Sequence, residues 1–510
     1  MVDPIVDFSE KIKTQKWLDY YLPKRYIFVF LALVGTICMY AIRASISVTI
    51  VAMVKQTVVL PEKRSLDSIA ECPNFDYNQS KIDNEEYKGE QYDWNIQKQA
   101  VILGSYFYGN IATQLLGGVL AEKFGAKHVY GIGILLTATV SLLFPLVASW
   151  SYVGVIVNRV IQGLGDGMTF PAINFAISKW SPESERSRSS AVIFSGMQIG
   201  TVIGMPIAGL LCTTDALGGW PSVFYIFGVI ACLWFVFWLV LIHENPSTHP
   251  SISKEELLYI EENKTEIKKK MSRDVWKSIF MSVPVWALAI AHFGFDYGFL
   301  VILTELPTYL STALKYDLKS NGLLSSLPFI TNVIGAWTAS FAADYLRKSN
   351  KMSITAIRKL MNSIGTFGPG LALIAVNFAG CRAELIIALL CIAMALSGFA
   401  YSGYNVTHMD MCPDFAGTLY GVTNSIANIS GVLAPMTVGI LTSNSATLAS
   451  WSKVFYTTAA VYIACGVIFA MFASAELQPW GTANSESKDE KQAVTDIDIK
   501  NVKTNYGDPC

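Results

Sequence analysis

Long apolar runs, separated by short polar segments, make up most of the chain. A membrane-spanning helix needs about 20 mostly apolar residues, and twelve segments of this kind are present. They cover residues 27–54, 96–120, 128–149, 152–178, 188–213, 221–242, 278–304, 322–343, 354–378, 383–408, 417–443 and 453–475. The pattern predicts an all-α polytopic membrane protein with twelve transmembrane helices.

The polar segments between these runs predict the orientation of the chain. Lysine and arginine concentrate in cytosolic loops because cations resist translocation. If the N-terminus is cytosolic, the short loops on its side carry ten lysines and arginines, and the opposite short loops carry four. We therefore expect both termini in the cytosol. The polar loop 55–95 then faces outward and places Asn78, in "NQS", where N-glycosylation can occur.

A shift of 231 residues aligns the two parts of the chain. Eight identities share this offset: Gly167/Gly398, Asn174/Asn405, Pro182/Pro413, Gly200/Gly431, Trp220/Trp451, Val223/Val454, Phe224/Phe455 and Tyr225/Tyr456. Parallel repeats are typical of transporters whose central site opens to one side and then to the other. We expect a cytosolic tail (1–26), a six-helix half (27–242), a charged cytosolic linker (243–276), a second six-helix half (277–475) and a cytosolic tail (476–510), with a central cavity between the halves.

Composition supports a membrane protein and argues against several other classes. Hydrophobic residues make up 52% of the chain and charged residues 15%, whereas soluble domains carry about 25% charged residues. A net charge of −1 gives no reason to expect nucleic-acid binding. The sequence shows no metal-binding cysteine spacing and no nucleophile–base or phosphate-loop constellation. We expect neither an enzyme nor a bound cofactor or metal.

Three charged residues lie inside predicted spans of the first half. Arg43 follows "YAI" in the first span, and Arg159 and Asp166 share one face of the fourth, about 10 Å apart along its axis. An arginine near the bilayer centre costs about 2.5–3.5 kcal/mol, so a counter-charge, a water-filled cavity or an anion must offset it. Both arginines are predicted at similar depth. We interpret them as an anion site, with Asp166 binding a proton or accompanying a sodium ion; a buried Arg–Asp pair that only locks helices is the alternative.

Two residues of the second half are candidates for coupling. Asp296 is either a second coupling carboxylate or a hydrogen-bonded helix clamp. His408 either titrates in a proton-coupled cycle or caps a helix at the cytosolic end. Glu305 lies near the predicted outer end of the seventh span, where it is either a gating residue or a snorkelling carboxylate.

Uncharged polar residues complete the candidate site. Asn174 and Asn405, which the repeat pairs, either line the path from both halves or bond neighbouring helices. Tyr40 and Tyr106 either line the cavity or belong to the packing and the interfacial belts in which membrane aromatics are common.

Several motifs resemble those of known transporters. "GGVLAEKFGAK" resembles the loop of the major facilitator superfamily between helices 2 and 3, with Glu122 and Lys123 in place of the usual Asp-Arg, and "AADYLRK", with Asp344, resembles it in the second half. "GSYFYGNIATQLLGG", "RVIQGLGDGMTFPA", "KWSPESERSRS", "LTELPTYL", "NGLLSSLPF" and "YNVTHMDMCP" resemble the anion/cation symporter family. That family contains sodium–phosphate cotransporters, the lysosomal sialic acid transporter and vesicular glutamate transporters.

The resemblance extends over residues 24–480 and implies the major facilitator fold. It implies substrate-anion binding at Arg43 and Arg159 and gating by Glu122, Lys123 and Asp344. Asp166 stands where relatives usually have a glutamate linked to proton coupling, so the charge is kept and the side chain is one methylene shorter.

Two departures concern the substrate. Vesicular glutamate transporters have an arginine about where Phe295 stands and a histidine where Asn174 stands. Both differences argue against glutamate loading of vesicles. The motifs "LTELPTYL" and "NGLLSSLPF" are most similar to the phosphate-cotransporter and sialic-acid branches, and the invertebrate group named for inorganic phosphate cotransport is nearest.

The sequence therefore predicts a secondary active transporter that couples an anion to a cation gradient. Sodium-dependent inorganic phosphate cotransport is the first interpretation. Proton-coupled transport of an organic anion, of the sialic acid or acidic amino acid type, in an endolysosomal or vesicular membrane is the second. A transport-inactive anion sensor is an alternative of another class. We expect a monomer that contacts the anion, Na⁺ or H⁺ and the bilayer but no nucleic acid. A plasma-membrane location is favoured because no acidic dileucine with good spacing is present.

Overall fold

The computed structural model describes residues 23–55, 90–262, 273–413, 415–443 and 446–481. Within these ranges the regular elements are helices, joined by turns and loops, and one isolated bridge links Val54 and Tyr92. Asn78, most of the loop 55–95 and most of both tails lie outside the described residues.

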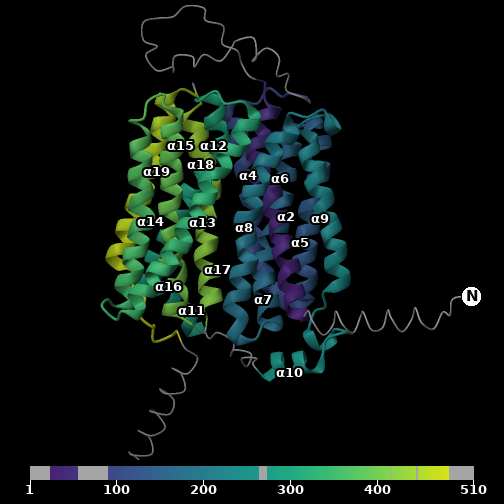
Figure 1. Cartoon of the computed structure of the whole chain (residues 1–510), viewed down its shortest axis with the longest axis vertical. Helices are drawn as coiled ribbons and strands as arrows, with labels where there is room; N and C mark the ends of the chain where they lie inside the picture. Colours follow the sequence, from purple (N-terminus) through teal and green to yellow (C-terminus); the bar gives the residue numbers. More distant parts are fainter. Residues whose placement is uncertain (1–22, 56–89, 263–272, 414, 444–445, 482–510) are drawn as a thin grey trace, which may run out of the picture.

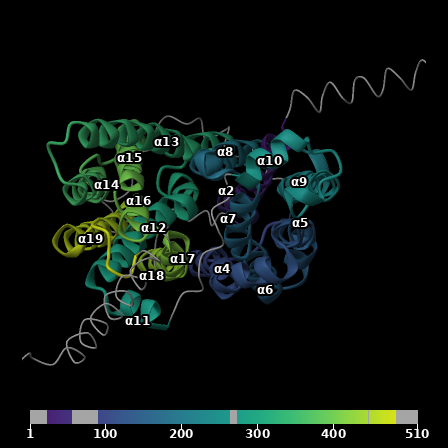
Figure 2. The ribbon, with the colours of Figure 1, turned by 90° about the horizontal axis from the view of Figure 1, so that it is seen from below.

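The first half contains α2 (Lys24–Met53), α4 (Ile96–Phe124), α5 (Ala126–Trp150), α6 (Tyr152–Gly167), α7 (Thr169–Trp180), α8 (Glu183–Cys212) and α9 (Pro221–Leu241). The second half contains α12 (Val283–Thr312), α13 (Leu318–Lys348), α14 (Ile354–Val376), α15 (Ala383–Ser397), η3 (Gly398–Ser402), α16 (Tyr404–Met411), α17 (Ala416–Ala427), α18 (Ile429–Leu441) and α19 (Leu448–Phe472). Between the halves lie α10 (Lys254–Glu262) and α11 (Arg273–Met281). The two bundles stand side by side (Figures 1 and 2).

Every predicted span is helical in the described residues. Eight of the helical segments are long and apolar enough to cross a membrane by length and composition. The all-helical, two-bundle architecture confirms the predicted all-α membrane fold, while the count of twelve transmembrane helices and the location of both termini in the cytosol stay predictions. The seventh span is displaced toward the C-terminus: α12 begins at Val283, with Pro284 in its first turn, and continues to Thr312. Glu305 therefore lies deeper in the helix than the sequence predicted.

The repeat is visible as a break in one helix of each half. Gly167 ends α6, and its repeat partner Gly398 begins η3. A Cβ atom at Gly167 would lie 2.3 Å from the carbonyl oxygen of Asn110, and one at Gly398 would lie 2.5 Å from that of Asn332. At both positions a residue larger than glycine would clash with the backbone of the neighbouring helix, which is α4 at Gly167 and α13 at Gly398. The fourth span and its partner are interrupted at equivalent places because each lies against such a neighbour.

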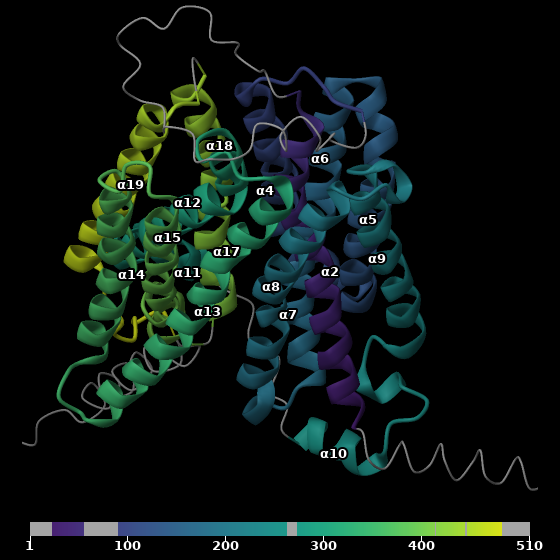
Figure 3. The same ribbon diagram turned by 45° about the horizontal axis from the view of Figure 1, so that its top comes forward.

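The two halves contact each other at the end of the bundle that carries the Val54–Tyr92 bridge. There α8 meets α13, where a Cβ at Gly209 would lie 3.1 Å from Gly322 Cα, and α4 meets α18, where a Cβ at Gly439 would lie 2.8 Å from Ala100 Cβ. Toward the opposite end, near α10, the halves diverge (Figure 3). If that end is cytosolic, as predicted, this is an inward-facing arrangement.

One cysteine bears on the predicted orientation. Cys381, between α14 and α15, is disulfide-bonded, whereas Cys38, Cys212 and Cys465, inside helices, are free thiols. Disulfides persist in oxidising compartments. The disulfide bond therefore agrees with the prediction that the end of the bundle where α14 connects to α15 faces the exterior or a lumen.

The linker holds helix ends of the first half together. Glu256 of α10 accepts hydrogen bonds from the backbone N–H groups of Lys24 (2.9 Å) and Arg25 (3.0 Å), at the start of α2. Glu244, just after α9, accepts from the N–H groups of Ala126 and Lys127 at the start of α5, both at 3.0 Å. A carboxylate is favourable at a helix N-terminus because it satisfies free N–H groups and the helix dipole.

We predict that Gly163→Ala destabilises the first half. A Cβ at Gly163 would lie 1.9 Å from the carbonyl oxygen of Tyr106, so α4 and α6 must separate to admit it. Overpacking of this kind costs about 1–3 kcal/mol. The measurement is the melting temperature of the purified protein in detergent. Gly417→Ala is the matched control, because a Cβ there meets open space; equal melting temperatures for the two variants would contradict the prediction.

Candidate functional site

Helices α2, α4 and α6 bring the predicted charged residues together inside the first half. Arg43 Nη1 lies 3.8 Å from Asp166 Oδ2, and the Asp166 side chain is completely buried. The side-chain amide of Asn110 donates a hydrogen bond to the same Asp166 oxygen at 2.7 Å. Arg43 Nη1 also donates to the hydroxyl of Tyr40 at 3.2 Å. Arg43 is therefore the counter-charge of Asp166, which the sequence had placed on one helix face with Arg159.

The two arginines share one aromatic neighbour. The Cζ atoms of Arg43 and Arg159 lie 5.1 and 4.8 Å from the ring centroid of Tyr106, within the range of cation–π contacts. Arg159 is 3% exposed and donates through Nη1 to Gln162 Oε1. The ring thus lies beside both guanidinium groups and brings them into one region of the protein. This agrees with the similar depth predicted for the two arginines.

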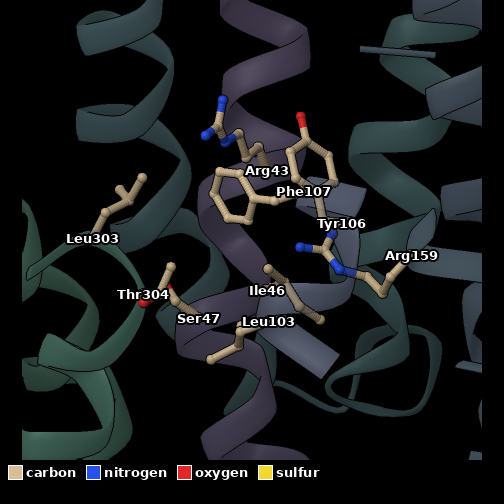
Figure 4. Close-up of a pocket in the computed structure, with 9 residues that line it drawn as sticks. All are labelled: Arg43, Ile46, Ser47, Leu103, Tyr106, Phe107, Arg159, Leu303 and Thr304. Carbon is tan, nitrogen blue, oxygen red and sulfur yellow. The ribbon is translucent and has the colours of Figure 1, made fainter. Parts of the chain in front are cut away.

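A small cavity lies next to these arginines, between the two halves (Figure 4). The first half contributes Arg43, Ile46, Ser47, Leu103, Tyr106, Phe107 and Arg159, and α12 of the second half contributes Leu303 and Thr304. Its lining combines two cations and three hydroxyl groups, those of Ser47, Tyr106 and Thr304, with apolar walls. Such a lining suits a small anion that needs hydrogen-bond donors and positive charge.

Several buried polar atoms of this site have no hydrogen-bond partner among the described residues. They are Asp166 Oδ1, Arg159 Nε and the Tyr106 hydroxyl. The Tyr106 hydroxyl interacts with the Asp166 carboxyl but does not meet hydrogen-bond geometry with it. Because an unsatisfied buried polar group costs about 1–3 kcal/mol, these atoms are available to water, an ion or a ligand.

A second buried polar cluster lies in the other half. His292 Nε2 of α12 lies 3.9 Å from Asp296 Oδ2, and His292 Nδ1 lies 3.2 Å from the hydroxyl of Thr423 on α17. His408 Nε2 of α16 lies 2.7 Å from the same hydroxyl. Asp296 and His408, both predicted as coupling residues, are therefore joined through His292 and Thr423.

The remaining candidates are spread over the molecule. Glu305 is 2% exposed, and the hydroxyl of Thr304, in the cavity wall, lies 3.3 Å from Glu305 Oε1. Its burial excludes the snorkelling alternative in this arrangement. Asn174 is exposed and donates to the backbone carbonyl of its neighbour Phe170, and Asn405 is half-buried. The structure thus does not bring Asn174 and Asn405 to the arginines.

The three gating residues suggested by the resemblance are exposed: Glu122, Lys123 and Asp344. Lys123 Nζ lies over the ring of Phe124, 5.3 Å from its centroid. In the last turn of α7, Lys179 Nζ pairs with Glu244, just after α9, at 2.7 Å. Glu244 thus links α5, α7 and the start of the linker, an arrangement that the sequence analysis did not anticipate.

Sequence reasoning also missed Asn110 and Thr423. Asn110 lies in the quoted motif "GSYFYGN", and a polar amide in an apolar span is a signal for a buried hydrogen bond. Thr423 gave no such signal, because threonine in a membrane helix commonly bonds its own backbone.

Comparison with known proteins agrees with this architecture. The family model of the Major Facilitator Superfamily matches residues 31–435. The solved structure of a D-xylose–proton symporter matches with a TM-score of 0.64 at 15% identity and covers 88% of this chain and 98% of its own. A bacterial homologue of the human lysosomal transporter Spinster, in an inward-facing and occupied conformation, matches with a TM-score of 0.65 at 12% identity and covers 88% and 96%. The chain belongs to the major facilitator superfamily.

Curated relatives place it more narrowly. A Drosophila melanogaster protein, named provisionally as an inorganic phosphate cotransporter, is 40% identical over 92% of this chain and 88% of its own. Human sialin is 37% identical over 89% and 90%, and vesicular glutamate transporter 1 of Xenopus tropicalis is 35% identical over 92% and 78%. These relatives confirm the group that the motifs indicated. The protein is a multi-pass membrane transporter of an anion-transporting group rather than an enzyme.

Proposed function

We propose that the protein is a secondary active transporter that couples movement of an anion to a cation gradient by alternating access. One observation carries this proposal: two guanidinium groups, that of Arg159 buried and that of Arg43 partly buried, flank a small cavity between the halves and share the ring of Tyr106. A cavity at the interface of the halves is where rocking of the two bundles changes access. We propose Arg43 and Arg159 as the anion ligands, with the Tyr40 hydroxyl orienting Arg43.

The Arg43–Asp166 pair supplies a reason for coupling. In the described arrangement Arg43 is the cation nearest to Asp166, at 3.8 Å. An anion that binds Arg43 competes with this carboxylate and leaves a buried negative charge without compensation. Removing one partner of a buried charge pair costs about 3–5 kcal/mol. A proton or a sodium ion at Asp166 offsets that cost, so anion and cation bind together.

The first form of this proposal is sodium-dependent inorganic phosphate cotransport at the plasma membrane. It is supported by the names of the Drosophila relatives at 40% identity. The motif differences at Phe295 and Asn174 argue against glutamate.

The second form is proton-coupled transport of an organic anion in an endolysosomal or vesicular membrane. The buried cluster of His292, Thr423 and His408 favours protons, because its hydrogen-bonded imidazole and hydroxyl groups can each donate and accept a proton. A protein that binds the anion only to signal would use the same arginines. Such a sensor differs from a transporter in one observable: it binds the anion but does not accumulate it across the membrane.

We expect cells that express the protein to take up radiolabelled phosphate in sodium medium, with saturable kinetics, and to lose this uptake when choline replaces sodium. Surface delivery is checked by biotinylation. No phosphate uptake above that of control cells, with the protein at the surface, would contradict the first form. Uptake of sialic acid or an acidic amino acid at low external pH would then support the second.

A further inference from the structure

The cluster in the second half contains a hydrogen-bonded series, His408–Thr423–His292, whose donors and acceptors follow from its geometry. His408 Nδ1 lies 3.0 Å from the backbone carbonyl of Asn405. A carbonyl only accepts, so Nδ1 carries the proton, and Nε2 of the neutral ring is the acceptor for the Thr423 hydroxyl at 2.7 Å. The Thr423 oxygen can then accept from His292 Nδ1 at 3.2 Å. His292 Nε2 is left as an acceptor that faces Asp296, 3.9 Å away.

The side chains of this hydrogen-bonded series are buried away from water. Thr423 is completely buried, and His292 and His408 are 2% and 1% exposed. The Asp296 side chain, at 21%, is the more accessible end. The Tyr404 and Tyr420 rings lie 4.8 and 5.4 Å from the His292 ring and enclose it.

Asp296 connects this cluster electrostatically to the arginine site of the first half. The charged and titratable groups with which Asp296 interacts electrostatically are Arg43 across the interface and the tyrosines Tyr40, Tyr401, Tyr404, Tyr420 and Tyr462. On the far side of His408, Asp410 pairs with Arg358 at 2.7 Å. Arg43 is thus the cation that interacts electrostatically with Asp296 across the interface.

The Thr423 hydroxyl can serve two protonation states of this hydrogen-bonded series. Besides His408 Nε2, it has a second acceptor, the backbone carbonyl of Tyr420 at 3.1 Å. When His408 is neutral, the hydroxyl donates to Nε2. When His408 carries both protons, Nε2–H donates to the hydroxyl oxygen, and the hydroxyl proton turns to the Tyr420 carbonyl.

We propose that Thr423 links His292 and His408 into a proton path that serves Asp296. This inference rests on the proposed cation-coupled transport and assigns the proton as a coupling ion. A proton on Asp296 passes to His292 Nε2, the His292 Nδ1 proton passes to Thr423, and the Thr423 proton passes to His408 Nε2. Charge balances within this shift, since Asp296 becomes a carboxylate and His408 becomes an imidazolium. Thr423 is a positioning residue, because it acts through the histidines.

The test uses the full-length protein in proteoliposomes, with radiolabelled phosphate or, if phosphate is not moved, sialic acid as the probe. Thr423→Val keeps the shape of the side chain and removes the hydroxyl, and Thr423→Ser restores the hydroxyl. Thr458→Val is the matched control, because Thr458 is equally buried and its hydroxyl donates to its own helix at Val454, 2.8 Å away. Each variant is assayed for accumulation driven by a pH gradient and for counterflow, which needs no net proton movement.

We expect Thr423→Val to lower pH-driven accumulation about tenfold, as the loss of one buried hydrogen bond allows, with counterflow unchanged. Thr423→Ser and Thr458→Val should behave as the wild type does. Unchanged accumulation in Thr423→Val, or equal loss of accumulation and counterflow, would overturn the proposed path. Wild-type accumulation that follows sodium and ignores pH would overturn it too, while leaving anion symport intact. A wild-type protein that moves neither anion would refute the proposed function, and this inference with it.

Discussion

Replacing Arg43 with glutamine is expected to abolish anion transport. The guanidinium of Arg43 lines the cavity and is the charge partner of Asp166. Glutamine keeps a polar side chain but is shorter than arginine and loses the charge and the bidentate donor geometry. Truncating one partner of a buried charged interaction costs about 2–5 kcal/mol, which corresponds to a loss of about 30-fold or more. The measurement is the initial rate of uptake of the transported anion, normalised to protein at the surface.

Two further variants separate binding from folding. Arg43→Gln leaves Asp166 without its charge partner, so the double variant Arg43→Gln/Asp166→Asn removes both charges and should recover folding but not transport. Arg347→Gln, at the exposed end of α13, is the control for loss of an arginine elsewhere. Wild-type uptake by a surface-delivered Arg43→Gln protein would show that the anion site is assigned wrongly.

Replacing Asp166 with asparagine is expected to uncouple transport from the cation gradient. The buried carboxylate has one oxygen without a hydrogen-bond partner among the described residues, and the other is held by Asn110. Asparagine is nearly isosteric but carries no charge, so anion binding at Arg43 no longer requires a compensating cation. Concentrative uptake should fall about tenfold or more, because without the carboxylate the cation gradient no longer drives accumulation. Exchange of anion for anion should persist.

The uncoupling is read from ion dependence. Wild-type uptake should respond to external sodium or to pH, and Asp166→Asn should respond to neither. Asp93→Asn, at an exposed position before α4, is the matched control and should keep the wild-type dependence. An Asp166→Asn protein whose uptake still follows the cation gradient would remove Asp166 from the coupling role.

Much of the fold could be predicted because each membrane-spanning helix requires a continuous run of mostly apolar residues, which is visible in the local sequence. Each predicted span is helical, and the repeat partners Gly167 and Gly398 mark equivalent helix breaks. The end of the seventh helix could not be placed, because "LTELPTYL" contains a glutamate and a proline and reads as a helix terminus. In the structure α12 continues through Pro307, and Glu305 becomes buried beside the cavity. Hydropathy alone does not distinguish a helix end from a polar position that faces a protein interior.

The site could be predicted in its charges but not in their pairing. Rise per residue placed Arg43 and Arg159 at one depth, and both line the cavity. The approach of Arg43 to Asp166 depends on how α2 packs against α6, which side-chain spacing within one helix does not specify. The link from Asp296 to His408 likewise passes through Thr423, on a third helix. Contacts between helices that are distant in sequence required the structure.

The most direct test of the central claim, that Arg43 binds the anion and Asp166 couples it to a cation, is counterflow measured side by side. Purified wild-type, Arg43→Gln and Asp166→Asn proteins are reconstituted into liposomes loaded with unlabelled anion, and entry of the labelled anion is followed without any cation gradient. The account predicts exchange by Asp166→Asn near the wild-type rate and no exchange by Arg43→Gln. Exchange by Arg43→Gln at the wild-type rate would contradict it.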